Sequence, residues 1–241
     1  MSKLAGLATD KSVKNETDSL GGFQTLDSSV YDCKIANAFI TMSQGKAMAF
    51  NLELKTADGK QMNQQLWVTS GEKKGCLNYY INKKTNEKHY LPGFNIANAI
   101  CLLTVGKELS KIDTEPGVAE VYGEKTKVDI MPELVGQDVT LGVIKQIVDK
   151  TAKSEDTGNW EPTGESRTEN EIDKVFRTRD GLTVTEIRGK MTEPIFKQKW
   201  LEKWDGEVKD RTTDTSGCAA EGAPAAKRET GAAAPEESLF A

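Results

Sequence analysis

Apolar and polar residues alternate along three segments in the first third of the chain, and this period predicts three consecutive β-strands. The first strand is expected at residues 31–39 and the second at 48–54. The turn sequence Asp58-Gly59 then predicts a hairpin into the third strand.

Side chains of a strand point alternately to its two faces, so the pattern also predicts what each face carries. In the first strand Tyr31, Cys33, Ile35 and Phe39 share the apolar face. In the second, Met48, Phe50, Leu52 and Leu54 lie opposite Asn51, Glu53 and Lys55. In the third, Met62, Leu66 and Val68 lie opposite Gln61, Asn63, Gln65, Trp67 and Thr69. The third strand therefore turns a large indole toward the polar side, where burial in the core does not explain it.

A short helix and a further strand are predicted downstream. Apolar residues at helical spacing follow Asn95, the expected N-cap, and stop at Gly106. Residues 132–135, which begin with a proline, predict a single turn, and the β-branched run 139–148 predicts a strand that is apolar on both faces.

Three more segments are predicted before the C-terminal region. The charged residues 151–170, rich in Gly, Ser and Thr, predict a mobile loop. Residues 173–187 predict a hairpin about Asp180-Gly181. A closing helix is expected at 194–204, with Phe196, Trp200, Leu201 and Trp204 along one side and packed on the strands.

Both ends of the chain differ from this central domain of residues 23–204. Residues 1–22 are polar and predict a flexible arm. Residues 205–241 carry −4 of the net charge of −5, and many of them are alanine, so we expect a disordered acidic tail with an apolar tip. The order of three strands, a helix and further strands predicts a mainly β fold with few helices, an OB-like antiparallel β-barrel.

Composition predicts a soluble protein of a reducing compartment. No apolar run is long enough to span a bilayer, and the first residues do not resemble a secretory signal. The cysteines show no disulfide framework and are expected to be free and buried. They are Cys33, Cys76, Cys101 and Cys218.

Most catalytic chemistry has weak support in the sequence. No Gly-Lys pair continues to Ser or Thr as a phosphate-binding loop requires. His89 is the only histidine, and a zinc site of Cys76, His89 and Cys101 would lack a fourth ligand and a familiar spacing. A metal-dependent nuclease remains an alternative. Its carboxylates would be Asp113, Asp129, Glu133 and Asp138.

Lysines interleaved with tyrosines between residues 72 and 90 favour binding over catalysis. Single-stranded nucleic acid offers phosphates that attract lysines and bases that stack on aromatic rings. The residues with these properties, together with Trp67, are Tyr79, Tyr80, Tyr90, Lys73, Lys74, Lys83, Lys84 and Lys88. The alternative is that the tyrosines close the core and the lysines keep a loop soluble.

The last residues of the tail predict a short partner-binding motif. Glu236 and Glu237 precede the apolar pair Leu239 and Phe240, a combination suited to a basic pocket with an apolar floor on another protein. An end of the chain without a role is the alternative.

Several short blocks resemble the single-stranded DNA-binding proteins of tailed bacteriophages, especially the podovirus type. They are Trp67-Val68-Thr69-Ser70-Gly71, Tyr79-Tyr80-Ile81, Leu91-Pro92-Gly93-Phe94-Asn95, Leu102-Leu103-Thr104-Val105-Gly106-Lys107 and Val139-Thr140-Leu141-Gly142. The resemblance implies an OB-type fold and a role in phage DNA replication, recombination or repair in the bacterial cytoplasm. The tail is similar in kind to those of bacterial single-strand binding proteins, but Ala241 follows Phe240 here.

The sequence therefore predicts a non-enzymatic protein that binds and protects single-stranded DNA, without cofactor or metal, while its tail recruits replication or recombination proteins. Whether the acidic tail also competes with DNA is open. A protein-interaction adaptor or phage transcription regulator, acting through Trp200, Trp204 and the tail, is the alternative from another class. Oligomeric state is open.

Overall fold

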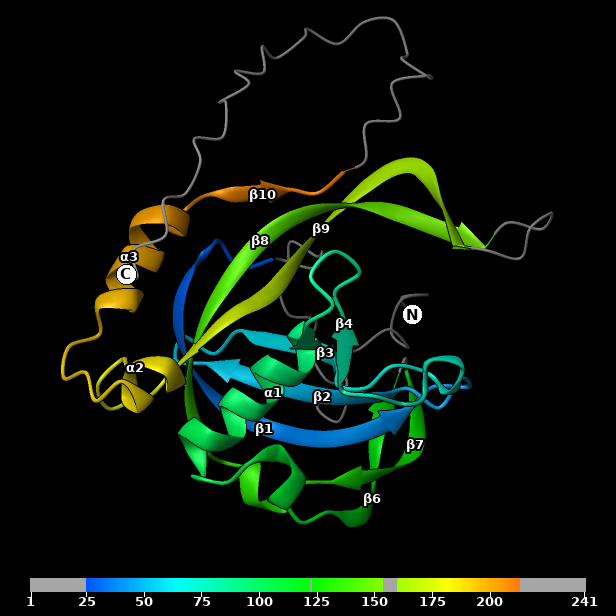
Figure 1. Ribbon diagram of the computed structural model, residues 1–241, viewed down its shortest axis with the longest axis horizontal. Coiled ribbons are helices and arrows are strands. Elements are labelled where there is room, and N and C mark those ends of the chain that lie inside the picture. Colours follow the sequence, from blue (N-terminus) through cyan, green and yellow to red (C-terminus); the bar gives the residue numbers. More distant parts are fainter. Residues whose placement is uncertain (1–24, 122, 154–159, 213–241) are drawn as a thin grey trace, which may run out of the picture.

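The computed structural model describes residues 25–121, 123–153 and 160–212 (Figure 1). Its strands are β1 (Ser29–Met42), β2 (Met48–Thr56), β3 (Gln61–Trp67), β4 (Tyr79–Ile81), β5 (Lys88–Tyr90), β6 (Glu115–Val121), β7 (Glu124–Ile130), β8 (Asp138–Lys153), β9 (Trp160–Phe176) and β10 (Val208–Asp210). Its helices are α1 (Pro92–Thr104), α2 (Val184–Arg188) and α3 (Ile195–Trp204), with 3-10 turns η2 (Glu72–Lys74), η3 (Leu109–Lys111) and η4 (Pro132–Leu134). The mainly β fold, the first three strands and the closing helix are confirmed.

The main sheet is antiparallel except for one short strand, and it does not close. Its path runs β3-β2-β1-β8, and β9 pairs with the other edge of β8. β10 pairs with β8 in parallel, and the β6–β7 hairpin joins β1 through β7. Among the described residues no ladder joins β3 to β9, so the sheet is not closed, and of the expected OB-like barrel the mainly antiparallel β-sheet is confirmed.

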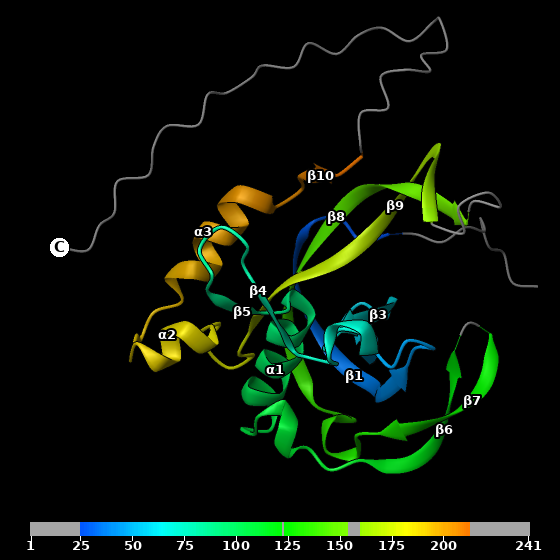
Figure 2. The same cartoon turned by 45° about the vertical axis from the view of Figure 1, so that its right-hand side comes forward.

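The gap in the sheet, here called the open seam, lies between β3 and β9. These two strands run in the same direction, because four successive antiparallel pairs connect them. Helix α1 packs against both β3 and β9, and Ile96 lines the seam between Gln64 and Ile172. Within the described residues no β-ladder forms on the outer edge of β3, so the seam stays open beside α1. In Figures 1 and 2 the β6–β7 hairpin lies at one end of the sheet and α2 and α3 lie at the other.

A bulge in β1 divides the core. The register of β1 against β2 shifts between Ile35 and Asn37. Ile35 therefore packs in the main core, whereas Phe39 packs with Ala119 and Val128 under the β6–β7 hairpin. The sequence analysis predicted that Ile35 and Phe39 share one face, and this prediction is wrong. The bulge adds one residue to β1, which reverses the alternation of the side chains beyond it.

Helix α1 begins earlier than expected. Its N-cap is Leu91, followed by Pro92, and the N–H of Asn95 already donates to the Leu91 carbonyl. Asn95 therefore lies inside the first turn, and its assignment as the N-cap is wrong. Proline is well suited to this first position because its fixed φ fits a helix and it has no N–H to leave unpaired.

The segment expected to be a mobile loop is mostly strand. β8 extends to Lys153, and β9 pairs with it from Trp160 to Phe176, so the prediction of a loop at 151–170 is wrong. Polar composition misled the prediction because this hairpin extends beyond the core and needs few apolar residues (Figure 1).

The hairpin expected at 173–187 is also wrong, because a helix follows the turn. Thr183 caps α2, accepting from the N–H of Glu186, whose carboxylate accepts from the Thr183 N–H. Glu186 also accepts from the N–H of Phe196 at 2.8 Å, which joins α2 to α3. Burial pushes the pKa of Glu186 upward, but these hydrogen bonds outweigh it and lower the pKa overall.

Ordered structure continues past the boundary expected at residue 205. β10 pairs with Lys145, and the N–H of Gly206 donates to the Ser28 carbonyl at 2.8 Å. The N–H of Arg211 donates to Ile147, so the prediction that the disordered tail begins at 205 is wrong. None of the helices in the described ranges is long and apolar enough to cross a membrane.

Candidate nucleic-acid interface

Trp67 lies at the end of β3 with its indole 45% exposed, as the alternation predicted. Its cross-strand partner is Ala49, which is small and buried, so the ring has no large neighbour in that row. Gly93, in the first turn of α1, lies against the backbone of Trp67. The helix therefore fixes the end of β3 and leaves the indole free to meet a ligand.

A basic turn lies beside this indole. The N–H of Glu72 donates to the Gly45 carbonyl at 2.7 Å, and Lys46 forms an ion pair with Glu72 at 2.5 Å, which together hold η2 on the β1–β2 turn. Lys73 and Lys74 follow in η2. Trp67, Lys73 and Lys74 line one groove of about 770 Å³, which is the open seam between β3 and β9.

The predicted tyrosines lie on a separate two-stranded ribbon, β4–β5. Tyr79 pairs with Tyr90, and Tyr80 pairs with His89. Because pairs alternate between the two faces of a ribbon, Tyr79 and Tyr80 point to opposite sides. The rings of Tyr79 and Tyr80 therefore do not share one face of the ribbon.

Exposure separates the tyrosines further. Tyr80 and Tyr90 are 49% and 56% exposed, and both line a second groove of about 520 Å³ together with Lys88. Tyr79 is half-buried, and the Lys88 ammonium lies 4.9 Å from the centre of its ring. Tyr80 and Tyr90 thus each expose a ring, on opposite faces of the ribbon because Tyr90 pairs with Tyr79, whereas Tyr79 supports the lysine.

The two grooves adjoin. The ribbon groove and the Trp67 groove lie next to each other along α1 and β9, and the walls of both contain Pro92, Ile96, Glu171 and Ile172. Lys83 and Lys84 lie in the turn of the ribbon and line neither groove. Of the predicted lysines, the structure brings Lys73, Lys74 and Lys88 to the aromatic grooves.

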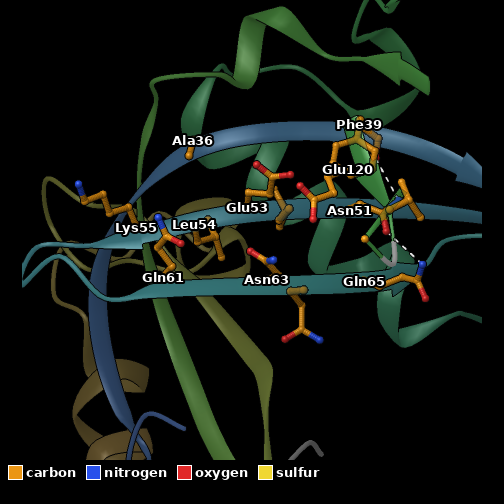
Figure 3. Close-up of a pocket in the computed structure, with 14 residues that line it drawn as sticks. Ala36, Phe39, Asn51, Glu53, Leu54, Lys55, Gln61, Asn63, Gln65 and Glu120 are labelled. Atoms are coloured by element: carbon orange, nitrogen blue, oxygen red, sulfur yellow. Dashed lines mark hydrogen bonds between the residues drawn. The ribbon is translucent and has the colours of Figure 1, made fainter. Parts of the chain in front are cut away.

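The polar face of β2 and β3 forms another groove that the sequence analysis did not name as a site. It measures about 640 Å³ and is lined by Asn51, Glu53, Asn63 and Gln65 among others (Figure 3). Alternation already placed these residues on the face of Trp67, so the signal was present. A fourth groove of about 810 Å³, toward the β6–β7 hairpin, has Trp67 and Gln65 in its wall, so Trp67 lies where grooves meet.

The cysteines do not form a metal site with His89. Cys33 and Cys101 are buried in the core, and burial raises the pKa of each thiol to about 12. Cys76 is exposed, so the expectation that every cysteine is buried is wrong, and Cys218 lies outside the described residues. No cluster of three potential metal ligands occurs in the part of the chain that the structure describes.

Among the carboxylates of the nuclease alternative, Asp113 and Glu133 lie together, since a backbone hydrogen bond from Asp113 helps to lower the pKa of Glu133, and the others lie elsewhere. Glu133 forms an ion pair with Lys107 at 2.6 Å, which lowers the pKa of Glu133, and Asp138 lies 3.7 Å from Lys34. Asp129 is exposed on β7 and Asp113 follows η3. These residues occupy different elements and give the alternative no geometric support.

The adaptor alternative loses one of its residues. Trp200 is buried against Ile144 and Phe176, and its indole N–H donates to Asp173 at 2.7 Å. Trp204 is half-buried, with the ammonium of Lys203 5.1 Å from its ring centre. The predicted partner-binding residues Glu236, Glu237, Leu239 and Phe240 lie outside the described residues.

No protein-family model matches this chain, and no match was found among curated proteins. The site is therefore interpreted from its own geometry.

Proposed function

We propose that this protein binds single-stranded DNA without enzymatic action, by stacking bases on exposed aromatic rings while lysines contact the phosphates. One observation carries the proposal: the indole of Trp67 is 45% exposed in a groove that also holds Lys73 and Lys74. Stacking contributes about 1–3 kcal/mol per base, and every base has a face that can stack. Such a site suits a strand of any sequence.

The fold supports this proposal. β1 pairs along one edge with β2 and along the other with β8, the helix α1 follows the third strand, and β3 and β9 run in the same direction across the seam. We include an OB-type fold in the proposal, because this pairing order is compatible with a five-stranded, partly open OB barrel in which β8 and β9 would be the fourth and fifth strands. OB folds bind oligonucleotides on the face of their second and third strands, where Trp67 lies.

The two adjoining grooves would give the strand a path. Bases would stack on Trp67 and then on Tyr80 or Tyr90, and the phosphates would follow Lys73, Lys74 and Lys88. Rings on separate elements, in adjoining grooves, would hold bases unstacked from one another, which would oppose pairing and so protect an open strand.

The resemblance of the sequence blocks supports a role in phage DNA replication, recombination and repair in the host cytoplasm. We include in the proposal that the acidic tail recruits replication proteins and competes with DNA for the lysines. Recruitment of proteins by the tail and its competition with DNA both depend on charge, so both are expected to weaken as salt screens the charges.

Tryptophan fluorescence tests the central proposal. Titration with poly(dT) is expected to quench part of the emission, with an affinity that falls steeply as salt rises. The chain has four tryptophans, so Trp67→Phe is compared with Trp204→Phe. Loss of most of the quenching only in Trp67→Phe supports the proposal. No binding of poly(dT) at low salt, or unchanged quenching in Trp67→Phe, overturns it.

A further inference from the structure

The groove on the polar face of β2 and β3 is built as a ladder of paired side chains that leads away from Trp67. Ala49 pairs with Trp67, and the following rows pair Asn51 with Gln65, Glu53 with Asn63, and Lys55 with Gln61. Every second residue shares a face, so these rows lie on one face of the sheet, and the last three of them line the groove, as Figure 3 shows. Successive rows are about 7 Å apart, because each spans two strand residues.

The first polar row is rigid. Asn51 is buried, and its amide nitrogen donates to the Thr41 hydroxyl at 2.8 Å and the Ala49 carbonyl at 3.1 Å. Its amide oxygen accepts from the amide nitrogen of Gln65 at 3.1 Å. These bonds fix the orientation of both amides, which gives the groove a defined floor next to the indole.

The next row carries negative charge. Glu53 of β2 and Glu120 of β6 enter the groove from opposite walls, and Figure 3 shows their carboxylates directed toward each other. Lys55 lies at the far end of the ladder, and Lys73 and Lys74 line the groove on the other side of Trp67. Phosphates are repelled by this pair of carboxylates and attracted to the lysines, so the groove suits a neutral base and excludes the backbone.

The polar groups of the groove select among bases. A carboxylate accepts a hydrogen bond from an exocyclic amino group, as Glu and Asp do with the amino group of cytosine. Thymine has carbonyl oxygens and no amino group, and its O4 would face Glu53 or Glu120. Side-chain amides such as that of Asn63 can both donate and accept at the remaining positions of a base edge.

We propose that this groove, here called the amide groove, reads the edge of a base next to the one stacked on Trp67, and that it favours cytosine over thymine. The inference rests on the proposed function, because it assigns base selectivity to the same DNA-binding face. Cytosine and thymine are both pyrimidines, so comparing them leaves ring size and stacking nearly constant.

The test compares the affinity of the full-length protein for oligo(dC) and oligo(dT) of equal length by fluorescence anisotropy. The wild-type protein is expected to bind oligo(dC) at least about fivefold more tightly, the low end of what one good base contact contributes. In the double variant Glu53→Ala/Glu120→Ala, the ratio of the affinities for oligo(dC) and oligo(dT) is expected to approach one. Oligo(dT) should bind as tightly as before or more tightly, because two negative charges that repel DNA are gone.

A matched control separates base reading from a change in net charge. Glu115→Ala/Glu124→Ala removes two carboxylates from the same β6–β7 hairpin, outside the amide groove, and is expected to keep the wild-type ratio. The proposal is overturned if wild-type protein binds both oligonucleotides equally or prefers oligo(dT), if the groove variant keeps the ratio, or if the control loses it as well. Failure to bind either oligonucleotide would instead contradict the proposed function itself.

Discussion

Gly93 and Trp67 touch through their backbones with no room for a side chain between them. A Cβ atom at position 93 would lie 2.4 Å from the Trp67 carbonyl oxygen and 2.9 Å from its amide nitrogen. Both atoms belong to the backbone, so no change of rotamer relieves the contact. The start of α1 thereby determines where the end of β3, and with it the indole, is held.

Replacing Gly93 with alanine is therefore expected to weaken both the fold and DNA binding. Alanine favours a helix over glycine by at most about 1 kcal/mol, whereas forcing an extra group into a packed site costs about 1–3 kcal/mol. The steric cost outweighs the gain in propensity, so we expect Gly93→Ala to lower the melting temperature and the affinity for poly(dT). Gly45→Ala is the control, because its nearest neighbour atom is 3.9 Å from the added carbon. Equal behaviour of the two variants would contradict this account.

The tyrosines of the ribbon are expected to contribute unequally. Tyr80 and Tyr90 expose their rings to a groove, so Tyr80→Leu and Tyr90→Leu should each weaken DNA binding by up to about 1–3 kcal/mol. Tyr80→Phe keeps a ring and should bind as the wild type does. Isothermal titration with a fixed oligonucleotide measures the differences, and thermal melting verifies the fold. Wild-type affinity in both leucine variants would remove the ribbon from the DNA path.

Salt dependence is expected to separate two lysine pairs with the same change of charge. Lys73 and Lys74 line the Trp67 groove, whereas Lys83 and Lys84 lie in the ribbon turn. Each phosphate contact to a single strand adds about 0.7 to the slope of log affinity against log salt. Lys73→Gln/Lys74→Gln should therefore reduce the slope by about 1.4, and Lys83→Gln/Lys84→Gln by clearly less. Identical slopes in the two variants would show that net charge alone matters.

The tail must be cut after residue 212 to test competition without damaging the fold. Ion pairs of Lys209 and Arg211 with Glu171, and the pairing of β10 with β8, belong to the folded domain. A protein of residues 1–212 should melt as the full chain does and bind DNA more tightly at low salt, whereas 1–204 should melt at a lower temperature. An unchanged affinity of 1–212 at low salt would end the idea of competition by the tail.

Two buried thiols are expected to reduce stability in alkali. Burial raises the pKa of Cys33 and Cys101 from 9.0 to about 12, so between these values the unfolded chain loses a proton that the folded chain keeps. Their contribution is complete below pH 9 and is lost as pH rises toward 12, at up to about 1.4 kcal/mol per pH unit for each thiol. Urea unfolding at rising pH under reducing conditions measures this slope. Cys33→Ala/Cys101→Ala should flatten it, and an equally steep slope in that variant would assign the loss to other groups.

Several features of the site could be predicted because they depend on local backbone geometry. A period of two fixes which side chains share a face, so Leu66 is buried and Trp67 is exposed as expected. The same rule places Tyr79 and Tyr80 on opposite faces of the β4–β5 ribbon. It could not be used there in advance, because the sequence did not predict this ribbon. Strands of three residues have too short a pattern to identify.

By itself, the sequence determined the first three strands, the faces of the second and third, and the presence of the helix that follows and of the closing helix, because periodicity acts over a few residues. Only the tertiary structure decided that β1 bulges after Ile35, that the polar segment 151–170 is largely a hairpin, and that Lys73 joins Trp67 while Lys83 does not. Those outcomes depend on contacts between residues far apart in the chain. Such contacts arise when elements pack, and no local pattern encodes which distant partner a side chain will meet.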